Sequence, residues 1–192
     1  MAVLRRVSGI VMGLALLLAG TACTGPAAGA PRVPRSAHPV PSPTREPAED
    51  AGGACLLLSF ELVAATTGVD FGASGSSNSG DTYTCVLRRV DAVLPDLALS
   101  VSPTLADTGV FTTSVVPKGA ATVADLGKAG YSRSLAASLT GAGPGAEVCW
   151  LSGNQRLMVL RYRGPAGTVP GDVTALGPKL VDLAKKVDQA SE

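Results

Sequence analysis

The stretch that decides the fold is EVCWLSGNQRLMVLRY, residues 147–162. Two largely apolar runs, residues 147–151 and 156–162, flank the four residues SGNQ at 152–155. Gly and Asn are typical of the tight turns that join antiparallel strands. The stretch therefore predicts a β-hairpin.

Further strands are expected on the N-terminal side of this hairpin. Residues 82–90 and 97–102 place apolar side chains at alternate positions, which indicates half-buried strands, and the proline-containing residues 91–96 between them indicate a hairpin loop. Residues 110–116, rich in Val and Thr, are a third strand candidate. The Gly- and Ser-rich residues 72–80 are expected to form a flexible loop.

Two helices are expected to flank the strands. Residues 56–67 have apolar side chains at helical spacing, and Gly68 is placed to end that helix. A second apolar stripe predicts a C-terminal amphipathic helix, and consists of Val173, Leu176, Leu180, Leu183, Ala184 and Val187. Pro178 lies inside the stripe, so the helix is expected to begin there or to be kinked. The fold class is therefore α+β: an antiparallel sheet packed against a short N-terminal helix and a C-terminal amphipathic helix.

Length and charge exclude several classes of protein. The chain has 192 residues, a formal net charge of +1 and a pI near 7.7. This length fits one modest domain and excludes a large multidomain enzyme. Because so small a charge gives no long-range attraction to phosphate backbones, no nucleic-acid partner is expected.

Residues 1–22 are typical of an export signal. Arg5 and Arg6 precede an apolar run at 7–22 that is shorter than the roughly 20 residues needed to span a bilayer. Its end, Leu18-Ala19-Gly20-Thr21-Ala22-Cys23, resembles the lipobox of bacterial lipoprotein precursors. That resemblance implies cleavage before Cys23 and attachment of a diacylglycerol to its sulfur. The alternative is cleavage after Ala30, where the following Pro31 would block ordinary signal peptidases.

A tether is expected between the lipidated cysteine and the folded domain. Residues 24–53 hold seven of the 14 prolines and show no apolar periodicity, so they cannot bury enough surface to fold. We therefore expect a signal peptide at 1–22, a lipidated, disordered tether at 23–53, and a single domain at 54–192.

The expected domain lacks the residues on which many enzymes depend. The only histidine, His38, lies in the tether, which leaves residues 54–192 without an imidazole base or an imidazole metal ligand. No nucleophile elbow, phosphate-binding loop or Cys-x-x-Cys motif is present. No catalytic residue, metal ligand or cofactor is therefore expected.

Two weaker chemical hypotheses remain. Asp91, Asp96 and Glu147 could supply a catalytic carboxylate pair, although isolated acids beside turns are usually solvated. Separately, Arg161 and Arg163 share one face of a strand and could form a small anion-binding patch with Arg156 nearby, although a solvated strand face is the more common meaning of this pattern.

Three cysteines remain once Cys23 is lipidated. Cys55 with Cys85 is the favoured disulfide, because it would tie the first helix to the first strand in an oxidising compartment. Cys149, beside Trp150 in an apolar strand, is then a buried, unreactive thiol. Pairing of Cys149 with either of the other two remains an alternative.

The domain resembles a family of small actinobacterial envelope lipoproteins catalogued as a domain of unknown function. The likeness rests on the opening Cys55-Leu56-Leu57-Leu58-Ser59, a helix ending at Gly68, Cys85 about 30 residues after the first cysteine, a Gly-rich approach to a strand at 126–131, and a closing helix. It implies an extracytoplasmic α+β domain with a Cys55–Cys85 disulfide, and no transferable activity. The chain departs from the family at Leu87, where an aromatic residue is common, and in having Cys149.

These features predict a lipoprotein on the outer face of the cytoplasmic membrane. Its expected role is that of a non-enzymatic binding or accessory module, with the membrane as a partner through the lipid and the ligand unknown. One alternative is a carrier that holds an apolar or lipid ligand between the sheet and the C-terminal helix. The other is a carboxylate-based cell-wall enzyme.

Overall fold

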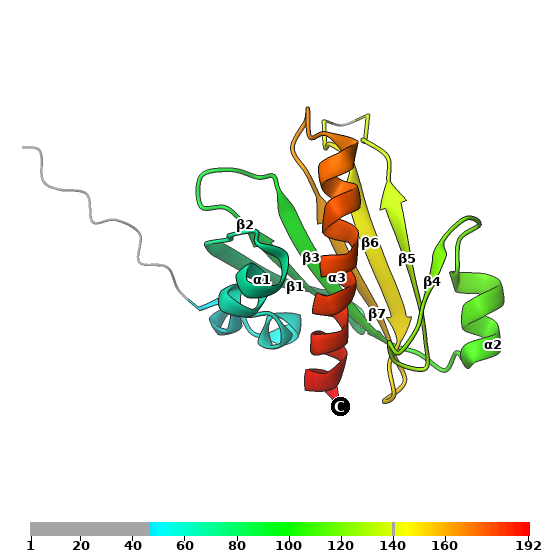
Figure 1. Ribbon diagram of the computed structural model, residues 1–192. Helices are drawn as coiled ribbons and strands as arrows, with labels where there is room; N and C mark the ends of the chain where they lie inside the picture. The colour runs from blue at the N-terminus through cyan, green and yellow to red at the C-terminus, as the bar shows by residue number, and fades with distance from the viewer. Residues whose placement is uncertain (1–46, 140) are drawn as a thin grey trace, which may run out of the picture. The chain divides into compact units, whose positions relative to one another are not determined.

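Seven antiparallel strands form one sheet in the computed structural model, which describes residues 47–139 and 141–192 (Figure 1). The strand order is β1-β2-β3-β7-β6-β5-β4. The strands are β1 (Ala73–Ser79), β2 (Thr82–Arg88), β3 (Asp96–Pro103), β4 (Ala121–Val123), β5 (Ala129–Leu135), β6 (Gly145–Leu151) and β7 (Arg156–Arg163). The predicted hairpin at 147–162 is confirmed as β6 and β7, and the predicted α+β class is confirmed as well.

One face of the sheet is covered by helices. The helix α3 (Pro170–Ser191) crosses this face, and α1 (Phe60–Thr67) lies beside it, after the 3-10 turns η1 (Ala48–Ala51) and η2 (Gly53–Leu57) (Figure 1). The strands present alternate residues to these helices, such as Leu99 of β3, Leu160 of β7 and Val148 of β6, which are fully buried in a row across the sheet. Burial of this face against α1 and α3 is the main source of stability.

A smaller apolar cluster lies on the opposite face. The segment formed by α2 (Thr108–Val110) and the π-helical turn η3 (Phe111–Val115) places Phe111 against Tyr131, Cys149 and Leu151. The rings of Phe111 and Tyr131 are 6.1 Å apart. This segment therefore covers one end of β5, β6 and β7.

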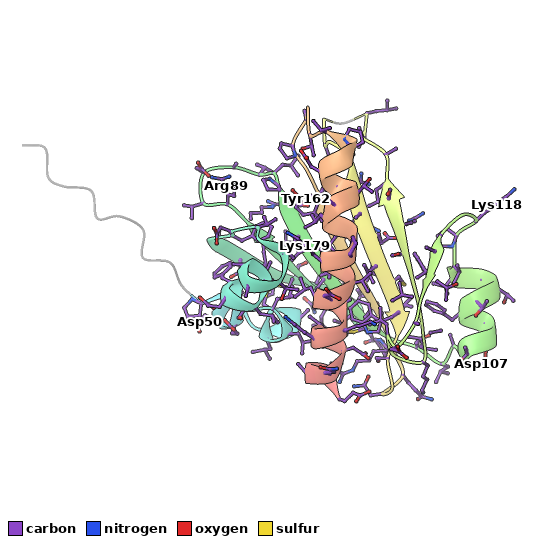
Figure 2. The ribbon with its side chains drawn as sticks, in the orientation of Figure 1. Asp50, Arg89, Asp107, Lys118, Tyr162 and Lys179 are labelled. Atoms are coloured by element: carbon purple, nitrogen blue, oxygen red, sulfur yellow. A yellow bond between two sulfur atoms is a disulfide. The ribbon has the colours of Figure 1, made fainter. Side chains whose placement is uncertain are left out.

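The first helix is shorter than predicted. It begins at Phe60 because the Ser59 hydroxyl accepts a hydrogen bond from the Leu62 N–H at 3.0 Å, which caps the helix there. Gly68, at a φ of 77°, ends it as predicted. Lys179 of α3, labelled in Figure 2, donates from Nζ to the Thr67 carbonyl at 3.3 Å and so ties the end of α1 to α3.

Two predictions about local structure between the helices were wrong. Residues 72–80 were expected to be a flexible loop, but they contain β1, whose ladder with β2 compensates for weak strand propensity. Residues 110–116 were expected to be a strand, but they are helical. The Asp107 carboxylate caps the Val110 N–H at 2.8 Å, and one apolar side chain, Phe111, is fully buried.

The C-terminal helix begins eight residues before Pro178, at Pro170. Proline fits a first helical turn, because the N–H it lacks would have no partner there. Pro178 sits on the exposed side of the helix, while the apolar stripe on the other side keeps both halves on the sheet. The expectation that the helix starts at Pro178 was therefore wrong.

The folded part also extends further toward the N-terminus than composition predicted. Ala48, placed in the expected tether, is fully buried, and η1 and η2 both contact β1. The folded domain thus includes residues before the predicted boundary at residue 54. The predicted signal peptide, Cys23 and the tether up to residue 46 lie outside the described residues.

The buried carboxylate of Asp188 fastens the end of α3 to the sheet. Its Oδ1 accepts a hydrogen bond from the Trp150 indole Nε1 at 2.8 Å, and its Oδ2 accepts one from the Gly127 N–H at 3.0 Å. Gly127 has a φ of 52°, and a Cβ at this position would collide with the Leu151 carbonyl, so only glycine can approach here. Asp188 therefore joins the helix, a strand and a turn.

Replacing Asp188 with alanine is expected to lower the free energy of unfolding by about 2–3 kcal/mol, because it leaves the buried Trp150 indole N–H without an acceptor and also removes the hydrogen bond from the Gly127 N–H. Asp182→Ala is the matched control, since Asp182 is exposed on the same helix, and it should cost less than about 0.5 kcal/mol. Urea denaturation measures both. Equal effects of the two variants would show that Asp188 does not fasten the helix.

Candidate functional site

The sheet face opposite α1 and α3, here called the open face, carries most of the chemistry that the sequence singled out. Among the described residues, the segment 108–120 packs on this face through Phe111, Val115, Val116 and Ala120, at one end of it. The rest carries small and charged side chains of β2, β3, β7, β6 and β5. These are Thr84, Val86 and Arg88, then Asp96, Ala98 and Ser100, then Arg161 and Arg163, and finally Glu147 and Arg133.

Glu147 lies at the centre of a closed network on the open face. The register places it directly between Arg161 of β7 and Arg133 of β5. Its Oε1 accepts hydrogen bonds from Arg133 Nε at 2.7 Å and from the Tyr131 hydroxyl at 3.0 Å. Its Oε2 accepts two from Arg161, from Nε at 2.9 Å and from Nη2 at 2.6 Å. Each carboxylate oxygen of Glu147 therefore accepts two hydrogen bonds from protein side chains.

The charge of Glu147 is stabilised by this network. Burial alone would raise its pKa, but the hydrogen bonds and charges of Arg133 and Arg161, with the Tyr131 hydroxyl, outweigh burial and hold the pKa below its usual value. The side chain is only 2% exposed, whereas the two arginines are 37% and 47% exposed. At neutral pH Glu147 is therefore a carboxylate that ties three strands together and is poorly suited to donating or accepting a proton.

The structure does not assemble the hypothetical carboxylate pair. Asp91 lies in the exposed loop between β2 and β3, where it pairs with Arg89 at 3.7 Å. Asp96 opens β3 and is flanked across the sheet by Arg88 and Arg163. Partial burial raises the pKa of Asp96 despite these arginines. Each of the three acids is thus surrounded by arginine rather than by a second carboxylate.

The arginine patch contains partly different residues from those that the sequence predicted. Arg161 and Arg163 share the open face, as predicted, but Arg156 points to the other face at the far end of β7. Arg133 and Arg88 take its place on the open face. Sequence reasoning missed Arg133 and Tyr131 because the small residues of AGYSRSL (129–135) hide the alternation that would mark a strand.

The disulfide between Cys55 and Cys85 is confirmed, with the two Cα atoms 4.9 Å apart. It joins η2 to the centre of β2, inside the core beneath α1 and α3. Cys149 is free and buried, as the favoured pairing implied. The alternative pairings of Cys149 are therefore excluded in this structure.

Burial raises the pKa of the Cys149 thiol to about 11, although Arg133 and Arg161 nearby favour the thiolate. At pH 8 only about one thiol in a thousand is then ionised. We expect iodoacetamide to label Cys149 at least about 100-fold more slowly in the native protein than in urea. Rapid native labelling would show that this side of the sheet opens readily.

Two hollows of about 540 and 490 Å3 are open to solvent at the ends of the sheet. The first lies among residues 136–138, 141–144 and 166–168 and the start of α3. The second lies between η2, Tyr83 and Pro103. The space between the middle of α3 and the sheet is filled by buried side chains such as Trp150, Leu180 and Leu183.

Within residues 47–139 and 141–192, no group of three metal-ligating side chains occurs. None of the helices in these ranges has the length and apolarity to span a bilayer.

No protein-family model, curated protein or solved structure matches this chain. The open face, with Glu147 and its arginines at the centre, is the candidate site that the geometry supports.

Proposed function

We propose that the chain is a lipid-anchored extracytoplasmic binding module without catalytic activity. In this proposal, Cys23 carries the lipid, residues up to 46 form the tether, and the domain presents its open face to a ligand outside the cytoplasmic membrane. The resemblance to envelope lipoproteins supports the same location. The Cys55–Cys85 disulfide is consistent with an oxidising compartment.

The observation that carries the non-enzymatic part is the saturation of Glu147. Of the three acids considered for catalysis it is the most deeply buried, and it has donors on both oxygens. A general acid would need a raised pKa and a free path to substrate, and Glu147 has neither. The filled space beneath the middle of α3 likewise favours a binding module over a carrier that holds an apolar ligand there.

The anchor is tested with Cys23→Ala. We expect the wild-type protein to incorporate labelled palmitate and to sediment with membranes, and the variant to be unlabelled and not retained. Cys149→Ala is the matched control and should keep both properties. An unlabelled wild-type protein would contradict the anchor.

The binding role is tested by a photo-crosslinking amino acid placed at Ser100 on the open face. The control position is Asp182, exposed on α3 on the other side of the sheet. We expect an adduct of defined mass from position 100 and none from position 182. Equal crosslinking from both would contradict a role for the open face. The absence of catalysis would be contradicted if the protein turned over peptidoglycan or an ester, and if this activity were abolished by one of three substitutions: Asp91→Asn, Asp96→Asn or Glu147→Gln.

A further inference from the structure

The open face carries two neighbouring charge triads, each with a carboxylate between two arginines. In one row across the strands, Asp96 of β3 lies between Arg88 of β2 and Arg163 of β7. In the next row, Glu147 lies between Arg161 and Arg133. Four guanidinium groups and two carboxylates leave this face with an excess of two positive charges.

Many of the guanidinium donors point to no protein acceptor. Glu147 uses only Nε of Arg133 and Nε and Nη2 of Arg161. Arg163 gives one hydrogen bond, from Nη1 to the Ala136 carbonyl at 2.8 Å. Among the described residues, the Arg88 guanidinium donates no hydrogen bond to a protein acceptor, and Asp96 forms no ion pair with an N···O distance of 4.0 Å or less. Donors of all four arginines thus remain free for a ligand.

The arginines are concentrated on this face. Residues 54–192 have six arginines, and four of them belong to the triads, whereas all five lysines of the chain lie outside the strands. Arginine is the side chain that grips phosphate and carboxylate groups with two parallel hydrogen bonds. Since residues 54–192 have one more acidic than basic residue, the excess of positive charge on the open face is local and does not follow from the net charge of the domain.

The spacing of the arginines fits a long ligand. Adjacent strands lie about 4.8 Å apart, so Arg88 on β2 and Arg133 on β5, four strands away, are roughly 19 Å apart. A single phosphate or carboxylate cannot reach both ends. Residues 108–116 stand on the same face beside the second triad, packed through Phe111. Because residues 108–116 project from the open face, they would hold a flat bilayer away from the arginines, whereas a thin polymer chain can lie along the arginines.

We propose that the open face binds a linear anionic polymer, with successive phosphate or carboxylate groups held by Arg88, Arg163, Arg161 and Arg133. This inference rests on the proposed function and names the ligand class of that binding module. The extracytoplasmic location in the proposed function makes envelope polymers, rather than nucleic acids, the ligands that the face would meet.

The test is titration of the full-length protein, in a nonionic detergent, with linear polyphosphate and with polyglutamate, by calorimetry at about 0.1 M salt. We expect saturable binding of at least one polymer. The double variant Arg88→Gln with Arg163→Gln should weaken polymer binding about tenfold or more. The slope of log affinity against log salt concentration should become smaller by roughly 1.5–2. The control double variant, Arg89→Gln with Arg156→Gln, changes the net charge equally and should weaken binding less than about threefold. Arg89, labelled in Figure 2, lies in the loop after β2, and Arg156 points to the other face of β7.

A single variant keeps the test valid if the double variant fails to fold. Arg88 is exposed at the end of β2, so Arg88→Gln alone should fold normally and weaken binding about threefold. Equal weakening by the two double variants, or no saturable binding of either polymer, would overturn the proposal. Tighter binding to phosphatidylglycerol vesicles than to either polymer would also overturn it. Crosslinking from Ser100 without polymer binding would reject this ligand class while leaving the binding module intact.

Discussion

Replacing Cys55 and Cys85 together with alanine is expected to lower the free energy of unfolding by about 3–4 kcal/mol. The disulfide closes a loop across a sequence separation of 30 residues, and it ties η2 to the middle of β2 within the main core. Without it the unfolded chain gains conformational freedom that the folded chain does not. Urea denaturation with and without a reductant measures the loss.

Cys149→Ala is the control for this experiment, because Cys149 is buried but makes no disulfide. It should cost roughly 1 kcal/mol, the cost of a small cavity, and the reductant should not change its stability relative to wild type. A double variant at 55 and 85 that is no less stable than Cys149→Ala would contradict a stabilising role for the disulfide.

Replacing Glu147 with glutamine is expected to cost about 2–4 kcal/mol at pH 7. Breaking a buried ion pair typically costs 3–5 kcal/mol, and the half-exposed arginines reduce this figure because water solvates them once the carboxylate is gone. The glutamine amide would also direct N–H donors at a guanidinium. Glu61→Gln, exposed on the first turn of α1, should cost about 0.5 kcal/mol or less.

This difference between wild type and Glu147→Gln should depend on pH. Because the pKa of Glu147 is lowered in the folded state, its contribution is complete above the pKa of the unfolded chain, near 4.3. The contribution is lost as the pH falls through the lower, folded-state pKa. The raised pKa of Asp96 acts in the opposite direction in both proteins and cancels in the comparison. A constant difference from pH 7 to pH 2 would show that the charge of Glu147 is not what stabilises the fold.

Patterns of apolar residues predicted the fold wherever one face of an element is buried. The hairpin at 147–162 and the stripe on α3 fall in this group, because the core selects their side chains. The strand β1 could not be predicted in this way. Its sequence, ASGSSNS, contains no large apolar side chain, and its pairing with β2 is set by the neighbouring strand. The opposite error arose at Phe111, where Val and Thr suggested a strand and a local cap produced a helix.

The site was predicted less well than the fold because it depends on register. Sequence placed Arg161 and Arg163 on one face, but it could not show that Glu147 lies opposite Arg161, or that Arg133, on a strand indicated only by the family resemblance, completes the network. Arg133, Glu147 and Arg161 are spaced 14 residues apart on consecutive strands, and the exact register of the two hairpins makes them neighbours. Cysteine count, in contrast, narrowed the disulfide to three pairings and favoured the one observed.

The strand order also bears on when the chain can fold. The central seam of the sheet joins β3 to β7, so residues 96–103 pair with residues 156–163, and the helix that covers the seam comes last in the chain. Contacts between such distant segments form slowly. During synthesis, which proceeds from the N-terminus, the chain can therefore complete its sheet only after residues 156–163 and α3 have emerged.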